Sequence, residues 1–110
     1  MVLNLKRGNV FWVNLDPTVG SEIRKKRPCV IIGATPINKA RRTVIVLPLS
    51  SSGSPRPPIT VEVECLGRKA IAVIDQIRAI DKSRLLEQAG SLSKTDLETI
   101  ERALRVVLGL

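Results

Sequence analysis

The sequence predicts a small, mainly β protein that ends in a helix. Short runs of strand-forming residues recur roughly every ten residues and are separated by turn-forming residues, as in a strongly twisted antiparallel sheet or barrel. Helical spacing of apolar residues occurs only near the C-terminus. A chain of 110 residues suits one hydrophobic core, and we therefore expect a single domain over residues 1–110.

Three strands are expected in the first half of the chain. Residues 9–15 (NVFWVNL) have the β-branched and aromatic content of a strand, which Asp16-Pro17 ends. Residues 28–34 (PCVIIGA) and 43–49 (TVIVLPL) are continuous apolar runs. Runs of this kind suit buried strands, because both faces of the strand are then covered.

Turns and further strands follow. Residues 35–42 (TPINKARR) indicate a turn, and residues 50–58 (SSSGSPRPP) indicate an exposed loop, because prolines cannot donate ladder hydrogen bonds. Residues 59–64 (ITVEVE) alternate with period two, as in a half-exposed strand. Apolar residues dominate again over residues 69–80.

Helix signals converge on the last segment. Ser93-Lys94-Thr95-Asp96 fits a capping box, in which the serine side chain accepts a hydrogen bond from the backbone three residues further on. Apolar residues then recur at helical spacing and predict one stripe buried against the sheet or a second subunit: Leu97, Ile100, Leu104, Val107 and Leu108.

The net charge of +8 is concentrated in the first part of the chain. Residues 1–42 hold nine lysines and arginines against two acids, whereas the rest is nearly balanced. This asymmetry is typical of a protein that binds a polyanion, most often nucleic acid, although a basic surface also serves solubility. Phe11 and Trp12 are neighbours and point to opposite faces, so at most one should stack on a base, and phosphate contacts must dominate affinity.

Composition also limits the compartment and the chemistry. No apolar run is long enough to span a bilayer and the N-terminus lacks a signal peptide's apolar core, so we expect a cytoplasmic protein with no membrane association. Cys29 and Cys65 are expected as small buried residues, with a disulfide as the less favoured alternative. Histidine, the usual general base near neutral pH, is absent from the sequence. Catalysis must use carboxylates, arginines and hydroxyls, and we expect no metal and no other cofactor.

These residue types suffice to cleave RNA. A carboxylate can deprotonate the 2′-hydroxyl if burial or a nearby phosphate raises its pKa. An arginine fork can stabilise the pentacovalent phosphorane through two oxygens at once. Glu22 and Asp75 are the two acids set among apolar or basic neighbours, and they are the candidates for the base.

Three motifs give the chain a family resemblance. The run KRGNVFWVNLDPTVGSEIRKKRPCVII, the later VIVLPLS, and DQIRAID are similar in content, order and spacing to the MazF/PemK family of toxin endoribonucleases from bacterial toxin–antitoxin systems. The resemblance covers nearly the whole chain. It implies an SH3-like small barrel with a C-terminal helix that works as a homodimer and cuts single-stranded RNA at short recognition sequences. It also implies 2′,3′-cyclic phosphate and 5′-hydroxyl ends, no metal, and a cognate antitoxin whose disordered C-terminal tail covers the groove.

The resemblance also implies roles for individual residues. Arg27, just before the strand-opening proline, matches the family's main transition-state stabiliser and possible proton donor, and Ser50 matches a hydroxyl that bonds the scissile phosphate. Glu22 and Asp75 both match acids that relatives use near the reaction, and the choice of base stays open. The expected RNA-binding residues are Arg24, Lys25, Lys26, Gln76, Arg78, Ser51 and Ser52.

A non-catalytic binding module of the same fold is the alternative hypothesis. It would be a gyrase-poisoning toxin, or an inactive paralogue that binds only antitoxin or RNA. The combination of Arg27, Ser50 and Asp75 weighs against this alternative, since a pure binder has no need of it.

Overall fold

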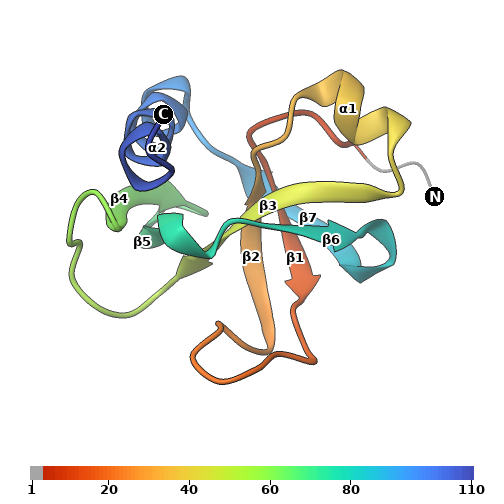
Figure 1. The fold of residues 1–110 in the computed structure, drawn as a ribbon, viewed down its shortest axis with the longest axis horizontal. Helices are drawn as coiled ribbons and strands as arrows, with labels where there is room; N and C mark the ends of the chain where they lie inside the picture. Colours follow the sequence, from red (N-terminus) through yellow and green to blue (C-terminus); the bar gives the residue numbers. More distant parts are fainter. Residues whose placement is uncertain (1–3) are drawn as a thin grey trace.

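The computed structural model describes residues 4–110 and confirms the mainly β fold with a C-terminal helix (Figure 1). Two α-helices, α1 (Thr35–Ala40) and α2 (Lys94–Val107), and two 3-10 turns, η1 (Ile74–Gln76) and η2 (Lys82–Arg84), accompany the sheet. Within the described residues the sheet has seven antiparallel strands: β1 (Asn9–Asn14), β2 (Lys26–Ile31), β3 (Thr43–Ser50), β4 (Thr60–Cys65), β5 (Arg68–Val73), β6 (Arg78–Asp81) and β7 (Leu85–Ser91).

Strand β3 lies at the centre of this sheet, which has the order β4-β5-β3-β2-β1-β7. One edge of β3 pairs with β2 through residues 46–48. The other edge pairs with β6 through residues 43–46 and then with β5 through Leu49 and Ser50. Because β5 and β6 share one edge, the sheet curls into a half-barrel, with β4 and β5 turned away from β1 and β2 (Figure 1).

Two hydrophobic clusters fill the curled sheet. The larger one lies beneath α2, where Ile100 and Leu104 pack on Leu47, Leu49 and other residues of the sheet. The smaller one is formed by the opposite face of the central strands, and its buried members are Leu5, Phe11, Val13, Leu15, Cys29, Ile31, Val44, Val46, Ile80 and Leu85. Burial of these side chains supplies most of the driving force for folding.

The cysteines are both buried and free, as expected, and they belong to different clusters. Cys29 packs in the smaller cluster and Cys65 in the larger. The disulfide alternative is therefore wrong. Among residues 4–110 no helix is long and apolar enough to cross a membrane.

Helix α2 begins where the capping signal predicts. The Ser93 hydroxyl accepts a hydrogen bond of 3.1 Å from the Asp96 backbone. The Asp96 carboxylate does not complete the box by turning back; it accepts a 2.9 Å bond from the backbone N–H of Glu64 in β4. The first turn of the helix is therefore tied directly to the strand that it covers.

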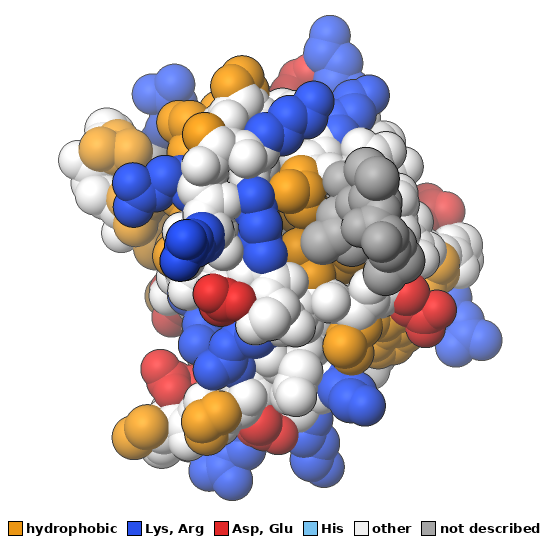
Figure 2. All heavy atoms as spheres, turned by 90° about the vertical axis from the view of Figure 1, so that its right-hand side faces the viewer, with side chains coloured by type: hydrophobic (Ala, Val, Ile, Leu, Met, Phe, Trp, Pro, Cys, Tyr) orange, Lys and Arg blue, Asp and Glu red, His pale blue; other side chains and the backbone are white. Residues whose placement is uncertain are grey.

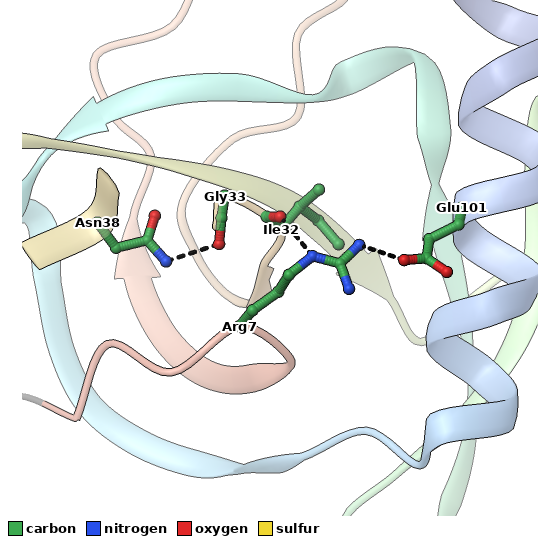
Figure 3. A network of polar contacts seen from close by, with 5 residues as sticks. All are labelled: Arg7, Ile32, Gly33, Asn38 and Glu101. Carbon is green, nitrogen blue, oxygen red and sulfur yellow. Dashed lines mark hydrogen bonds and ion pairs between the residues drawn. The ribbon is translucent and has the colours of Figure 1, made fainter. Parts of the chain in front are cut away.

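Arg7 joins three parts of the fold (Figure 3). Its Nε donates to the carbonyl oxygen of Ile32 at 2.9 Å, and its Nη2 lies 2.8 Å from a carboxylate oxygen of Glu101 on α2. Beside it, Asn38 of α1 donates to the carbonyl oxygen of Gly33 at 2.7 Å. Arg7 belongs to the basic N-terminal part of the chain, but its side chain connects that segment with Ile32 and with α2.

The structure differs from the sequence prediction in two segments. Residues 35–42 were expected as a turn, which is wrong, because residues 35–40 form α1. Pro36 sits in the first turn of that helix, where no backbone donor is needed, and buried Asn38 ties it down. Strand β7 was missed because only Leu85 in it is fully buried, which leaves no alternating pattern to detect.

Candidate active site

The four consecutive cations of residues 24–27, at the end of the β1–β2 loop and the start of β2, differ in how exposed they are. Arg24, Lys25 and Lys26 are exposed, whereas Arg27 is half-buried at the start of β2. Arg27 Nε donates to the Arg24 carbonyl oxygen at 3.0 Å. Its two outer nitrogens have no hydrogen-bond or ion-pair partner among residues 4–110, so they are available for a ligand.

Arg27 and Ser50 line the same cavity, which we call the arginine hollow. It has a volume of about 500 Å³, and Lys26, Arg68 and Lys69 bring three further cations to it. The lining contains no acid among the described residues, which makes the cavity suited to a phosphate group. The full lining is Trp12, Lys26, Arg27, Pro28, Leu49, Ser50, Ser51, Cys65, Leu66, Arg68, Lys69 and Ala70.

The two aromatic residues lie on opposite faces, as expected. Phe11 is 2% exposed and belongs to the smaller cluster. Trp12 is half-buried and borders the arginine hollow. Trp12 is therefore placed where it could contact a base, and Phe11 is part of the hydrophobic core.

Ser50 ends β3 at the edge of the hollow. Its hydroxyl makes only long contacts to Ser52, at 3.3 Å to the carbonyl oxygen and 3.4 Å to the hydroxyl. Hydroxyl hydrogen bonds are usually near 2.7–2.8 Å, so these contacts are weak and can be exchanged for a phosphate oxygen. Ser51 lines the hollow, whereas Ser52 lies outside its lining.

The two candidate bases lie in a second cavity, the acid hollow, of about 460 Å³. Glu22 and Asp75 line it together with Gln76 and Arg78. The β1–β2 hairpin contributes to both cavities, through Glu22 in its loop and Arg27 at the start of β2. The structure thus gathers all four expected catalytic residues around one loop, in two cavities rather than one.

Gln76 holds this loop in place. Its side-chain oxygen accepts a 2.9 Å hydrogen bond from the Ile23 N–H, and its side-chain nitrogen donates to the Ser21 carbonyl oxygen at 3.4 Å. Both ends of the amide are therefore engaged by the protein. Gln76 was expected to contact RNA, and its contacts support a positioning role instead.

The two acids differ in their hydrogen bonds. Glu22 Oε1 accepts a 2.6 Å bond from the Val19 backbone N–H, which closes the turn that carries it. Asp75 is exposed at the start of η1, and its carboxylate has no hydrogen bond or ion pair within residues 4–110. The Glu22 carboxylate therefore has a structural role in the turn through Oε1, whereas the Asp75 carboxylate has no hydrogen bond to the described part of the protein.

Cys29 lies close to an arginine from each cavity. Burial raises the pKa of the Cys29 thiol to about 12, and the charges of Arg78 and Arg27 oppose this rise. An arginine from each hollow therefore contributes to the charge that acts on this thiol. A thiol with so high a pKa stays protonated at neutral pH and is no nucleophile.

Sequence reasoning missed Arg68 and Lys69. They begin β5, whose pairing with the end of β3 matches Ser50 with Ile71 and brings the β4–β5 turn beside the hollow. The Leu66-Gly67 turn was visible in the sequence, but its approach to β3 depends on pairing between distant segments. No local signal marks these two cations as part of the site.

Comparison with known proteins identifies the family. Residues 6–108 match the family described as PemK-like, MazF-like toxin of type II toxin-antitoxin system. Endoribonuclease MazF of Staphylococcus epidermidis is 35% identical over 111 residues, an alignment that covers 96% of this chain and 92% of that protein. The chain belongs to the PemK/MazF family of type II toxins, which confirms the resemblance carried by the three motifs.

Solved structures show the same fold. The crystal structure of MazF (Form-I) from Deinococcus radiodurans has a TM-score of 0.86 at 24% identity, with 96% of each chain covered. An endoribonuclease in complex with its cognate antitoxin, from mycobacterial species, has a TM-score of 0.80 at 21% identity and covers 96% of this chain and 95% of that one. At these identities the likeness supports the curled sheet and the C-terminal helix.

Burial of Cys29 predicts a specific loss of stability at high pH. The thiol keeps its proton up to a pKa of about 12 in the folded protein and ionises from about 9.0 when unfolded. Between these values the unfolded state binds fewer protons, so the free energy of unfolding should fall by about 1.4 kcal/mol per pH unit on this account. Urea denaturation of the native protein and Cys29→Ala across this range measures the difference. Equal slopes for the two proteins would contradict the assignment.

Proposed function

We propose that this chain is the cytoplasmic toxin of a type II toxin–antitoxin system and a metal-independent endoribonuclease for single-stranded RNA. Its family and its relative named endoribonuclease MazF support the proposal. The observation that carries it is the arginine hollow, where Arg27 and Ser50 meet three more cations beside the hollow that holds Glu22 and Asp75.

The chemistry follows from these two cavities. The scissile phosphate binds in the arginine hollow. The free outer nitrogens of Arg27 donate to two of its oxygens, and the Ser50 hydroxyl donates one further hydrogen bond to the phosphate. A carboxylate takes the proton of the neighbouring 2′-hydroxyl, and the 2′-oxygen bonds to phosphorus. The bond from phosphorus to the 5′-oxygen breaks, and that oxygen takes up a proton from solvent. The products are a 2′,3′-cyclic phosphate and a 5′-hydroxyl.

Arg27 serves in this scheme by charge. Arginine side chains stay protonated in proteins, so stabilising the doubly charged phosphorane suits Arg27 better than donating a proton. The exposed Arg24, Lys25 and Lys26 attract the backbone, and Arg78 adds a cation beside the candidate bases. Trp12 is the ring placed to contact a base next to the cleaved bond.

A cognate antitoxin would block the same surface. We place its C-terminal tail across the arginine hollow, whose cations suit an acidic or extended segment. Bound antitoxin and bound RNA would then exclude one another.

A second copy of the chain covers a hollow beside α2 in this proposal. We call it the apolar hollow after its isoleucine and leucine side chains, although four charged residues of α2 also line it: Glu98, Glu101, Arg102 and Arg105. The hollow has a volume of about 610 Å³ and lies between the C-terminal end of α2 and the outer face of β3. Ile45 is 39% exposed there, and Leu108 and Leu110 are 51% and 83% exposed. Apolar side chains gathered at one surface in this way are typical of an interface between subunits.

Removing the Arg27 guanidinium should abolish most cleavage. We expect Arg27→Ala to lower kcat/KM about 10²–10³-fold, as for other groups that stabilise transition-state charge, while the circular dichroism spectrum stays native. The assay follows cleavage of a mixed RNA pool in EDTA, with mapping of the ends. Arg24→Ala is the matched control and should retain most activity. Full activity of Arg27→Ala would overturn the site, and intact RNA with the native protein would favour the non-catalytic alternative.

The identity of the base can be tested by removing each carboxylate. We expect Asp75→Asn to lower kcat about 10²–10⁴-fold and to abolish the acidic limb of the pH profile. Glu22→Gln should keep that limb and most of the activity, because the glutamine side-chain oxygen can still accept the hydrogen bond from Val19 that closes the turn. The reverse pattern would make Glu22 the base.

The proposed dimer should be visible in solution. Size-exclusion chromatography with light scattering should give twice the mass of the chain, and Ile45→Asp should shift it toward the monomer, because a charge would be buried in the interface. Val19→Asp is the control, since Val19 is 79% exposed on the β1–β2 loop and lies outside the apolar hollow. A monomeric native protein would contradict this part of the proposal.

A further inference from the structure

A second group of cations lies at the opposite end of β3 from Ser50. It consists of Lys39 in α1, Arg41 and Arg42 just before β3, and Lys82 in η2, and we call it the distal basic patch. Figure 2 shows lysine and arginine side chains gathered on this side of the molecule, toward which α1 and the turn between β6 and β7 lie in Figure 1. None of these cations was assigned a role in the site described above.

Tertiary structure brings the two parts of the patch together. The Lys82 backbone N–H donates to the Arg42 carbonyl oxygen at 3.0 Å, and Lys82 Nζ lies 3.5 Å from the Lys39 carbonyl oxygen. Antiparallel pairing of Thr43 with Asp81 sets this arrangement. Residues some forty positions apart in the sequence therefore present their charges at one place.

The charges of the patch are not neutralised within the protein. Lys39, Arg41 and Arg42 are exposed, and no member of the patch forms an ion pair among residues 4–110. The neighbouring acid is Asp81, whose carboxylate accepts a 2.8 Å bond from the Ser83 N–H. Hydrogen bonds from Ser83 and the charges of Arg84 and Arg42 lower the pKa of Asp81, so it offsets at most one of the four charges of the patch. Positive charges held close together repel one another, so binding of a polyanionic ligand would reduce this electrostatic repulsion.

Two strands connect the patch with the candidate active site. Strand β3 runs from the patch to Ser50, a length of about 23 Å at 3.3 Å per residue. Strand β6 is a shorter path, since it begins at Arg78 in the acid hollow and ends beside Lys82. A surface hollow of about 300 Å³ lies at the patch itself and is lined by Ala40, Arg41, Arg42 and Thr43.

We propose that the distal basic patch binds phosphates of the RNA that continues beyond the cleaved bond. This inference rests on the proposed endoribonuclease function and adds to it a second contact region, outside both hollows. Adjacent arginines suit phosphates, because each planar fork can donate to two oxygens of one group. Such contacts carry no base information, so they increase affinity for long RNA without changing which sequence is cut.

The test compares two variants of equal charge on two RNAs. Arg41→Ala/Arg42→Ala removes two cations of the patch. Lys6→Ala/Lys94→Ala is the matched control, because it removes two exposed cations that line neither hollow of the site nor the proposed dimer hollow. The substrates carry one mapped cleavage sequence within about 5 or about 25 nucleotides, so that only the longer strand can extend beyond a site of ordinary size. Cleavage gives kcat/KM, and fluorescence anisotropy gives the affinity for the long RNA at several salt concentrations.

We expect the patch variant to lose about tenfold in kcat/KM on the long RNA and nothing on the short one. Its slope of log affinity against log salt should be shallower by about 1.4, from two lost phosphate contacts on a single strand. The control variant should match the native protein. Equal losses on both RNAs, equal effects of both variants, or an unchanged salt slope would overturn the inference. Anisotropy with labelled polyglutamate adds a further comparison. If the patch variant lost affinity for polyglutamate and not for RNA, the inference would be overturned in favour of an acidic protein partner.

Failure of the proposed function would be seen separately. If the native protein cut neither RNA, the enzyme assignment would fail, and the anisotropy measurement would still decide whether the patch binds the strand. If both RNAs were cut and the patch variant bound like the native protein, the patch inference alone would fail.

Discussion

The structure depends on the way β3 shares its backbone hydrogen bonds. One edge serves β2, and the other serves β6 first and β5 afterwards. A strand cannot pair with two partners on one edge unless they follow each other along it, so the sheet must curl where β6 ends and β5 begins. The two hydrophobic clusters lie on opposite faces of the central strands, and Ser50 ends β3 where β5 pairs with it.

The candidate site lies at the end of β3, where the ends of several strands and their loops meet. Gln76 fixes the β1–β2 loop with hydrogen bonds to Ile23 and Ser21. The loop in turn places Arg27 in a cavity with cations only, while Glu22 faces Asp75 in the next cavity. The cations of the arginine hollow are thus apart from both carboxylates, whereas Arg78 lies in the same hollow as the carboxylates.

Much of this was predictable from local patterns. Four strands and the C-terminal helix follow from apolar runs, alternation and a capping serine, and the structure confirms them with shifts of a few residues at their ends. Helix α1 and strand β7 were not predictable, because both depend on contacts with distant residues. Hydrogen bonds of the buried Asn38 stabilise α1, and pairing with β1 stabilises β7. The family was recognisable from three motifs, and the comparisons confirm it.

By itself the sequence determined the fold class, the family and the singular position of Arg27, since these depend on periodicity and on residues close together in the chain. Only the tertiary structure decided which residues share a cavity. Arg68 and Lys69 line the arginine hollow because β5 pairs with β3, and Lys82 lies beside Arg42 because β6 pairs with the same strand. Contacts between distant segments follow from the burial of the whole core, which no local stretch of sequence encodes.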